Sequence, residues 1–425
     1  MDSGPLDFDL GPFDCIIFNY CFWGRCLSVT PDFRQRVARF SGLKIAIFQD
    51  EYDYFLWHEQ TVVALGINTI ITCVPEAHWH DVFRDDVFRR RTFINALTGY
   101  VPDNLLHLPP PKPLASRQWA IGYRSRPVPF IYGRLTQDKL LIGQRMKEIC
   151  FKRGIAANIE VTEEARIYGA AWPDFIGNCR TVLGTESGSN VFDFDGTLKP
   201  AIDSYLKAHP DADFESVHER FLNEHDGKIR MNQVSPRIFE AIAMRTGLVL
   251  FEGEYSGVVR PWEHYIPLKI DFSNIDEVLD AVNDIAGLNA MTERAYADVI
   301  ASWRYHYQTY VKRIDAHITE VTPPTKGYEP MYGLVGWRKE EQPLLGMPNQ
   351  NLKLPTDIPL QCIDHVPDPF LLVRCNWAAL HRAIMRRYKS ILYSRTGQLT
   401  QERLMRHRVA YIILRKCVRW LTGRR

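Results

Sequence analysis

The sequence lacks the features of a secreted, disulfide-bonded or membrane-spanning protein. Residues 1–12 are acidic and have no basic region followed by an apolar core, so we expect no secretory signal peptide. No apolar run is long enough to cross a bilayer. The nine cysteines are odd in number and include no C-x-x-C pair, so we interpret them as reduced thiols rather than as disulfides or a zinc site. These absences favour a cytoplasmic protein that binds no metal.

The composition is that of a globular protein with an uneven distribution of charge. The chain has 425 residues, 46% of them hydrophobic and 24% charged, which allows two or three domains. From Val373 to the end there are 14 Arg and Lys residues and one acid, Glu402, so this segment carries +13. Because the whole chain carries +2, the remainder carries −11. A basic tail on an acidic body suggests an anionic partner for the tail.

Apolar runs that alternate with amphipathic segments predict parallel sheets covered by helices on both faces. In the first part of the chain we expect strands at residues 14–20, 43–48, 68–74 and 92–97, and helices at 31–40, 57–65 and 78–88. A proline-rich stretch at 102–116 predicts a linker. After it we expect strands at 118–123, 157–161, 181–186 and 248–251, and helices at 139–153, 172–178, 235–246, 274–286 and 292–319.

The helix expected after Asn232 has clear local signals. Ser235 is a suitable N-cap, and Pro236 suits the first helical position, where its missing N–H costs nothing. Gly247 supplies a left-handed residue to end the helix. A short strand then leads into the glycine-rich loop 252–257. The helix start favours an anion such as a diphosphate, and the loop lies at the strand end where open α/β sheets bind ligands.

The same stretch carries a family resemblance. The segments SPRIFEAIAMRTGLVLFEGEYSGVV (235–259), PWEHYIPLKIDFSNIDEVLDAV (261–282) and LGTESGSNVFDFDG (183–196) resemble the donor domain of GT-B glycosyltransferases, most nearly the CgeB-like group of the glycosyl transferase group 1 type. The resemblance implies two Rossmann-like α/β domains, a nucleotide diphosphate sugar as donor, and Glu240 as the residue that binds the ribose.

We divide the chain accordingly. Residues 1–112 form a short acceptor-side Rossmann-like domain, and 113–288 form the donor-binding Rossmann-like domain. Residues 289–325 contain a helix that crosses back to the first domain, and 326–425 form an irregular segment followed by basic amphipathic helices.

Several further residues are candidates for the site. The segment YGRLTQDK (132–139) resembles the phosphate-binding segment of many GT-B transferases. Either of two cation pairs could meet the diphosphate: Arg124 with Arg126, or Arg134 with Lys139. The strand-end residues Asp50 and Glu51 are candidates for a catalytic base. The complete set of expected site residues is Asp50, Glu51 and Glu186 as catalytic, and Arg124, Arg134, Lys139, Ser187, Arg237, Glu240, Glu254, Tyr255 and Ser256 as donor-binding.

The expected function is transfer of a sugar to a glycan or lipid-linked acceptor in surface polysaccharide biosynthesis. Lys139 and Arg237, with the helix start, would stabilise the leaving diphosphate without a metal or other cofactor. Retaining families often carry a second glutamate eight positions before the ribose glutamate, but Asn232 stands there, so retention and inversion both stay open.

Two other functions compete with this one. The segment VFDFDGTL resembles the first motif of haloacid-dehalogenase-type phosphatases, with Asp193 as nucleophile and Asp195 as general acid. The sequence shows no convincing later acidic pair for Mg²⁺. The short first domain also permits a catalytically degenerate GT-B protein that only binds partners.

The basic C-terminal segment has two interpretations of equal weight. Its helices place Trp and Tyr beside arginines, which suits an anionic membrane surface contacted by residues 369–425. Alternatively, they pack on the body as a helical hairpin. No nucleic-acid-binding motif accompanies the charge, so we expect no nucleic acid partner and a location in the cytoplasm or on the inner face of the plasma membrane.

Overall fold

A computed structural model describes residues 9–11, 13–23, 31–108 and 111–322, all of which belong to one compact unit, Met1–Pro324. The expected basic helices of 326–425, and with them the membrane prediction for 369–425, lie outside the described residues. None of the helices within these ranges is long and apolar enough to cross a membrane.

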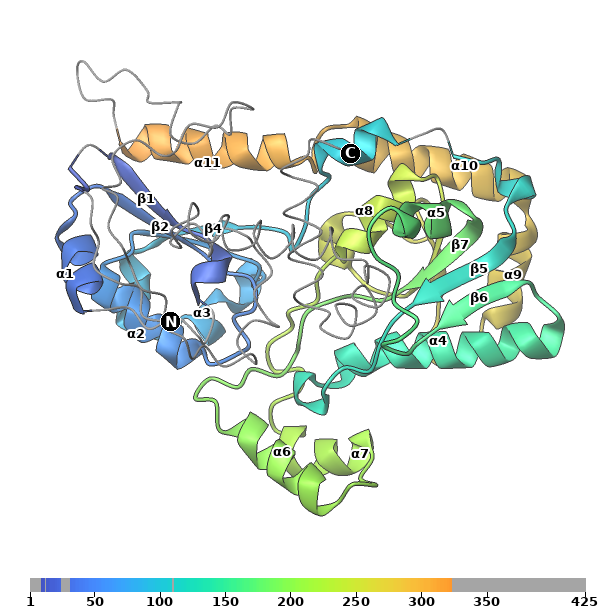
Figure 1. The fold of residues 1–425 in the computed structure, drawn as a ribbon, viewed down its shortest axis with the longest axis horizontal. Helices are drawn as coiled ribbons and strands as arrows, with labels where there is room; N and C mark the ends of the chain where they lie inside the picture. The colour runs from blue at the N-terminus through green and yellow to red at the C-terminus, as the bar shows by residue number, and fades with distance from the viewer. Residues whose placement is uncertain (1–8, 12, 24–30, 109–110, 323–425) are drawn as a thin grey trace, which may run out of the picture. The chain divides into compact units, whose positions relative to one another are not determined.

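The first domain contains a parallel sheet of four strands in sequential order (Figure 1). The strands are β1 (Cys15–Phe18), β2 (Leu43–Ile47), β3 (Thr69–Thr72) and β4 (Thr92–Asn95). Each strand lies within a run predicted from the sequence. The helices are α1 (Pro31–Arg39), α2 (Phe55–Leu65) and the short α3 (Trp79–Val82). The helix expected at 78–88 is replaced by α3 and a separate 3₁₀ turn, Asp86–Arg90.

The second domain contains a parallel sheet of five strands in the order β6-β5-β7-β8-β9. The strands are β5 (Trp119–Arg124), β6 (Ala157–Glu160), β7 (Cys179–Gly184), β8 (Gly247–Phe251) and β9 (Ile266–Leu268). The helices that pack around this sheet are α4 (Arg134–Arg153), α5 (Ala171–Gly177), α8 (Pro236–Ala243), α9 (Ile275–Asn283) and α10 (Ile285–Ala295) (Figure 1). The predicted fold class, two Rossmann-like α/β domains, is therefore confirmed.

Gly247 does not end the helix as expected. Helix α8 stops at Ala243, and Arg245 adopts the left-handed conformation with φ 45°. Gly247 is instead the first residue of β8, where an added Cβ would lie 2.6 Å from Leu288 Cδ1. The absence of a side chain there lets the strand pack closely on α10.

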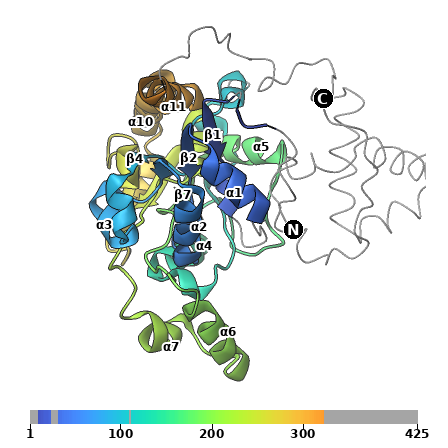
Figure 2. The same ribbon diagram turned by 90° about the vertical axis from the view of Figure 1, so that its left-hand side faces the viewer.

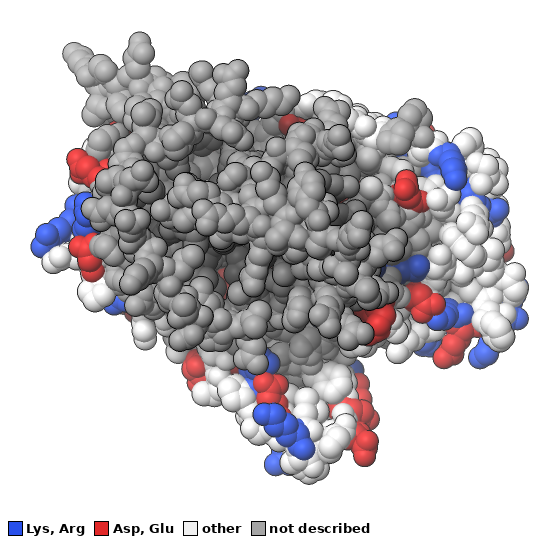
Figure 3. All heavy atoms as spheres, in the orientation of Figure 1, with Lys and Arg blue, Asp and Glu red and all other residues white. Residues whose placement is uncertain are grey.

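A helical insert, which the sequence did not indicate, separates β7 from α8. It contains α6 (Leu198–Ala208) and α7 (Phe214–Val217), which lie apart from both sheets in two perpendicular views (Figures 1 and 2). Basic and acidic side chains lie side by side on its exposed face (Figure 3). The chain that leads to and from the insert packs Phe192, Ile229 and Met231 into the core of the first domain, so this segment joins the two domains.

The helix expected at 292–319 is broken in two. Helix α10 continues through a π-helical turn, Tyr296–Ala301, and a new helix, α11 (Tyr307–Val321), begins after Trp303, whose φ is 61°. The break is held by tertiary contacts, because the Val101 N–H donates to the Tyr305 carbonyl oxygen at 2.8 Å. Through Ile314 and its neighbours, α11 packs on the sheet of the first domain.

Candidate functional site

A cavity of about 870 Å³ lies between the two domains. Its second-domain wall is formed at the carboxyl ends of β5 and β7, by Arg124 and Gly184, and at the start of α8. Asp50 and Tyr52, which follow β2, line the wall contributed by the first domain. A crevice at the carboxyl ends of parallel strands is where open α/β sheets bind their ligands.

The start of α8 faces this cavity. Pro236 occupies the first turn as predicted, and Ser235, Pro236 and Arg237 all line the cavity. The Ser235 hydroxyl makes no capping hydrogen bond, contrary to the expectation from sequence. The first turn therefore has backbone N–H groups that its N-cap side chain does not satisfy, and such a helix start attracts anions.

Three cationic side chains from separate segments line the cavity together: Arg126 after β5, Lys139 on α4 and Arg237 on α8. Burial, together with the positive charges of Arg237 and Arg126, lowers the pKa of Lys139 to about 8. Arg126 has a loose ion pair with Glu163 at 3.7 Å, and Arg237 donates to the carbonyl oxygen of Arg124 at 2.6 Å. The Lys139 backbone carbonyl oxygen accepts from the Tyr123 hydroxyl at 3.0 Å. The Lys139 side chain has no ion pair or hydrogen bond among the described residues, so this ammonium group has no close acidic partner.

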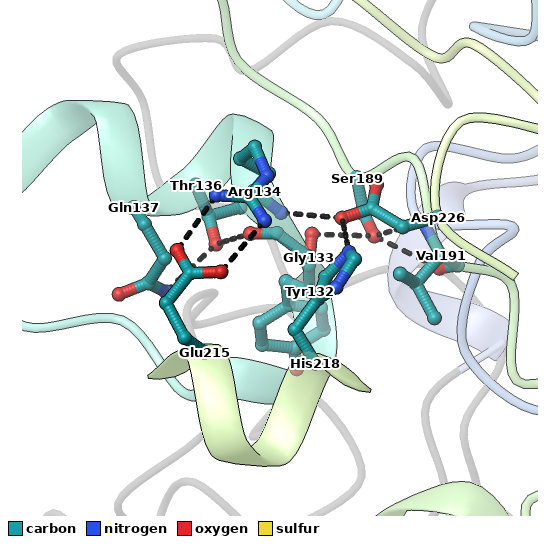
Figure 4. A network of polar contacts seen from close by, with 10 residues as sticks. All are labelled: Tyr132, Gly133, Arg134, Thr136, Gln137, Ser189, Val191, Glu215, His218 and Asp226. Carbon is teal, nitrogen blue, oxygen red and sulfur yellow. Dashed lines mark hydrogen bonds and ion pairs between the residues drawn. The ribbon is translucent and has the colours of Figure 1, made fainter. Parts of the chain in front are cut away.

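Two of the predicted phosphate-binding arginines are engaged elsewhere. Arg124 lines the cavity, but its guanidinium donates to the backbone and side chain of Asn158 and stacks on Phe175. Arg134 does not line the cavity; it forms two hydrogen bonds with Glu215 of the insert, at 2.8 and 2.9 Å (Figure 4).

The start of α4 is also occupied by the insert. Asp226 accepts from the Arg134 backbone N–H at 2.7 Å and contacts His218 at 3.2 Å (Figure 4). This carboxylate explains why α4 begins at Arg134, five residues before the helix expected from the sequence.

Glu240 lies on α8 and lines the cavity. Its carboxylate oxygen Oε2 accepts from the Trp172 indole N–H at 2.7 Å. Burial raises the pKa of Glu240, while the Trp172 hydrogen bond and the Arg237 charge counteract this.

Glu186 forms hydrogen bonds with the backbone of the glycine-rich loop 252–257. One carboxylate oxygen accepts from the backbone N–H groups of Glu254 and Tyr255, at 3.1 and 2.8 Å, and the other accepts from Asn232 at 2.6 Å. Ser256 accepts from the Val234 N–H at 3.1 Å. Neither Glu186 nor residues 254–256 line the cavity, whereas Ser187 does.

Of the two acidic residues considered as a catalytic base, only Asp50 lines the cavity. Its carboxylate accepts from the Tyr52 hydroxyl at 2.7 Å, and burial raises its pKa. Glu51 is fully buried and accepts from Thr72, and burial raises its pKa to about 7.

The D-F-D-G motif has a structural role in the insert. The two carboxylate oxygens of Asp193 accept from the Leu198 and Lys199 N–H groups at the start of α6, at 3.2 and 3.1 Å. Asp193 is only 2% exposed, and Asp195 accepts from Thr197 in the adjoining turn. This geometry leaves the Asp193 carboxylate without the open approach that a nucleophile needs.

Within the described residues, no group of three or more His, Cys, Asp or Glu side chains is arranged to hold a metal ion. Sequence reasoning missed Trp172, Ser125 and Thr98 as cavity-lining residues. Their positions follow from the way the two domains meet, and no local motif marks them.

No protein-family model and no curated protein matches this chain. Similar solved structures include TarM (12% identity over 72% of this chain and 54% of that chain, TM-score 0.37) and an α-glucosyltransferase in complex with UDP-glucose and DNA (10%, 72% and 80%, TM-score 0.41). Another is HepE of Anabaena in complex with UDP (12%, 69% and 78%, TM-score 0.39). The chain thus spans about half of the length of TarM. All three TM-scores are below 0.5.

Proposed function

We propose that this protein is a GT-B glycosyltransferase that uses a nucleotide diphosphate sugar as donor. The observation that carries the proposal is the convergence of Arg126, Lys139 and Arg237 on one cavity beside the start of α8. Two arginines, a lysine whose side chain has no ion pair among the described residues, and helix N–H groups that face the same cavity suit a diphosphate. Two cation pairs were considered from the sequence, Arg124 with Arg126 and Arg134 with Lys139. The geometry favours one member of each pair, Arg126 and Lys139, as a diphosphate-binding residue.

In the proposed reaction, the bond between the sugar C1 and the diphosphate oxygen breaks, and the electron pair goes to the diphosphate. Lys139 and Arg237 stabilise the negative charge that develops there, so we propose that no metal is required. Asp50, on the opposite domain, takes the proton from an acceptor hydroxyl as it attacks C1. Its raised pKa is suited to this role because a stronger base accepts the proton more readily.

Calorimetry with UDP, GDP, ADP and CMP tests donor binding. We expect saturable binding of at least one nucleotide by the wild type and a loss of about tenfold or more in affinity for Lys139→Gln. Failure of the wild type to bind any of the four would remove the support for a glycosyltransferase. Binding without transfer to any acceptor, in the presence or absence of EDTA, would favour the degenerate binding protein instead.

The acceptor and location follow from the family resemblance. We propose a glycan or lipid-linked glycan of a surface polysaccharide as acceptor, and a cytoplasmic protein that contacts the inner face of the plasma membrane through residues 369–425. Co-sedimentation with vesicles that contain anionic lipid tests the latter, with the chain truncated after residue 368 as comparison. Equal pelleting of both proteins would remove the membrane contact.

A further inference from the structure

Trp172 and Glu240 lie on different helices and meet at the cavity. Trp172 is the second residue of α5, and Glu240 is on α8, 68 residues later in the chain. Both line the cavity, and their hydrogen bond is 2.7 Å long. A hydrogen bond from a neutral N–H to a carboxylate is stronger than one between two neutral groups.

The Trp172 ring is itself held in place. It stacks on Phe175 with ring centroids 5.7 Å apart and an interplanar angle of 25°. The Arg237 guanidinium carbon lies over the Trp172 ring, 5.4 Å from the ring centroid. The ring also packs against the core that contains α8. A donor held by packing can fix the rotamer of the carboxylate that accepts from it.

The two oxygens of the Glu240 carboxylate differ in their surroundings. Oε2 accepts from Trp172, whereas Oε1 has no hydrogen-bond partner among the described residues. Because Glu240 lines the cavity and Oε1 is not among its buried unpaired atoms, this oxygen is accessible to a ligand.

We propose that Trp172 is a positioning residue, whose indole N–H holds one oxygen of Glu240 so that the other meets the ribose hydroxyls of the donor. The inference rests on the proposed function, because it assigns Glu240 to the ribose. A glutamate side chain has three rotatable bonds, and fixing it before the ligand arrives lowers the entropy lost on binding. Trp172 therefore affects ribose recognition without contacting the ribose.

A double-mutant cycle in the full-length chain tests this role. Affinities for UDP, GDP and ADP, and for their 2′,3′-dideoxy counterparts, are measured by calorimetry for the wild type, Trp172→Phe, Glu240→Ala and the double variant. Trp172→Phe keeps an aromatic ring against Phe175 but removes the indole N–H, together with part of the ring volume. Trp262→Phe, at a side chain that is 44% exposed, is the matched control.

We expect Trp172→Phe to weaken binding of the ribonucleotide about tenfold, to change binding of the dideoxy analogue less than twofold, and to have no effect in the Glu240→Ala background. Equal losses for both nucleotides, an undiminished loss in the Glu240→Ala background, or no loss at all would overturn the positioning role while the proposed function stands. Absence of nucleotide binding by the wild type would overturn both.

Discussion

Lys139 and Arg237 line one cavity from different helices, and the charge of Arg237 adds to burial in lowering the pKa of Lys139 to about 8. The folded protein thus holds two like charges close together, and the Lys139 ammonium has no acidic side chain paired with it among the described residues. A bound diphosphate would supply that negative charge and would raise the pKa of Lys139 again.

The first prediction concerns the pH dependence of nucleotide binding. Because an anion binds the protonated lysine better, affinity should be constant below pH 8 and should fall by up to tenfold per unit above it. Calorimetry with UDP or GDP between pH 6.5 and 9.5 measures this. Lys139→Gln should abolish the decline, whereas Lys147→Gln, on the same helix but paired with Glu160, should keep it. A decline unchanged in Lys139→Gln would assign the titration to another group.

The second prediction separates chemistry from donor binding at Asp50. Asp50→Asn should reduce the rate of sugar transfer about a hundredfold or more and leave nucleotide affinity within twofold, because the amide cannot accept the acceptor's proton. Steady-state transfer and calorimetry measure the two quantities. Asp86→Asn, at an exposed position paired with Arg89, should change neither. Retention of full activity in Asp50→Asn would exclude Asp50 as the base.

The third prediction concerns stability and Glu51, whose pKa is raised from 4.5 to about 7 by burial. The folded protein keeps a proton that the unfolded chain releases, so stability falls as pH rises from 4.5 to about 7. This loss amounts to about 3 kcal/mol and should be absent in Glu51→Gln. Urea unfolding at pH 5 and pH 8 measures it, with Glu76→Gln at an exposed position as control. Equal pH dependence in wild type and Glu51→Gln would contradict the assignment.

The fourth prediction tests the contact between the insert and the first domain. A Cβ added at Gly196, whose φ is 75°, would lie 2.0 Å from the Tyr54 ring. Gly196→Ala should therefore reduce the free energy of unfolding by about 2–4 kcal/mol, through crowding as well as backbone strain. Gly154→Ala has a similar φ of 65° but nothing within 4 Å, so it should cost only about 1 kcal/mol. Equal losses in urea unfolding would show that the insert yields at this contact.

The fifth prediction concerns Asp193. Because its carboxylate accepts two N–H groups at the start of α6, Asp193→Ala should destabilise the protein by about 1–2 kcal/mol. Neither wild type nor variant should release phosphate from simple phosphomonoesters. Phosphate release by the wild type that Asp193→Asn abolishes would restore the phosphatase interpretation.

The strands and the key helix could be predicted because their signals are local. Mainly apolar runs such as 43–48 and 68–74 mark strands buried on both faces, and Pro236 marks a helix start from the residue itself. A local pattern can also predict a contact that does not form: Ser235 is a good N-cap by residue type, yet its hydroxyl makes no capping hydrogen bond.

The sequence by itself determined two parallel sheets, the α8 start and a set of charged residues around it. Only the tertiary structure decided which of those residues share the cavity. Arg134 pairs with Glu215, 81 residues away in the sequence. Glu186 accepts from the backbone N–H of Glu254, 68 residues away, whereas Glu240 lines the cavity. The physical reason is that backbone propensity acts over a few residues, while a charged side chain takes the partner that folding brings within hydrogen-bonding distance.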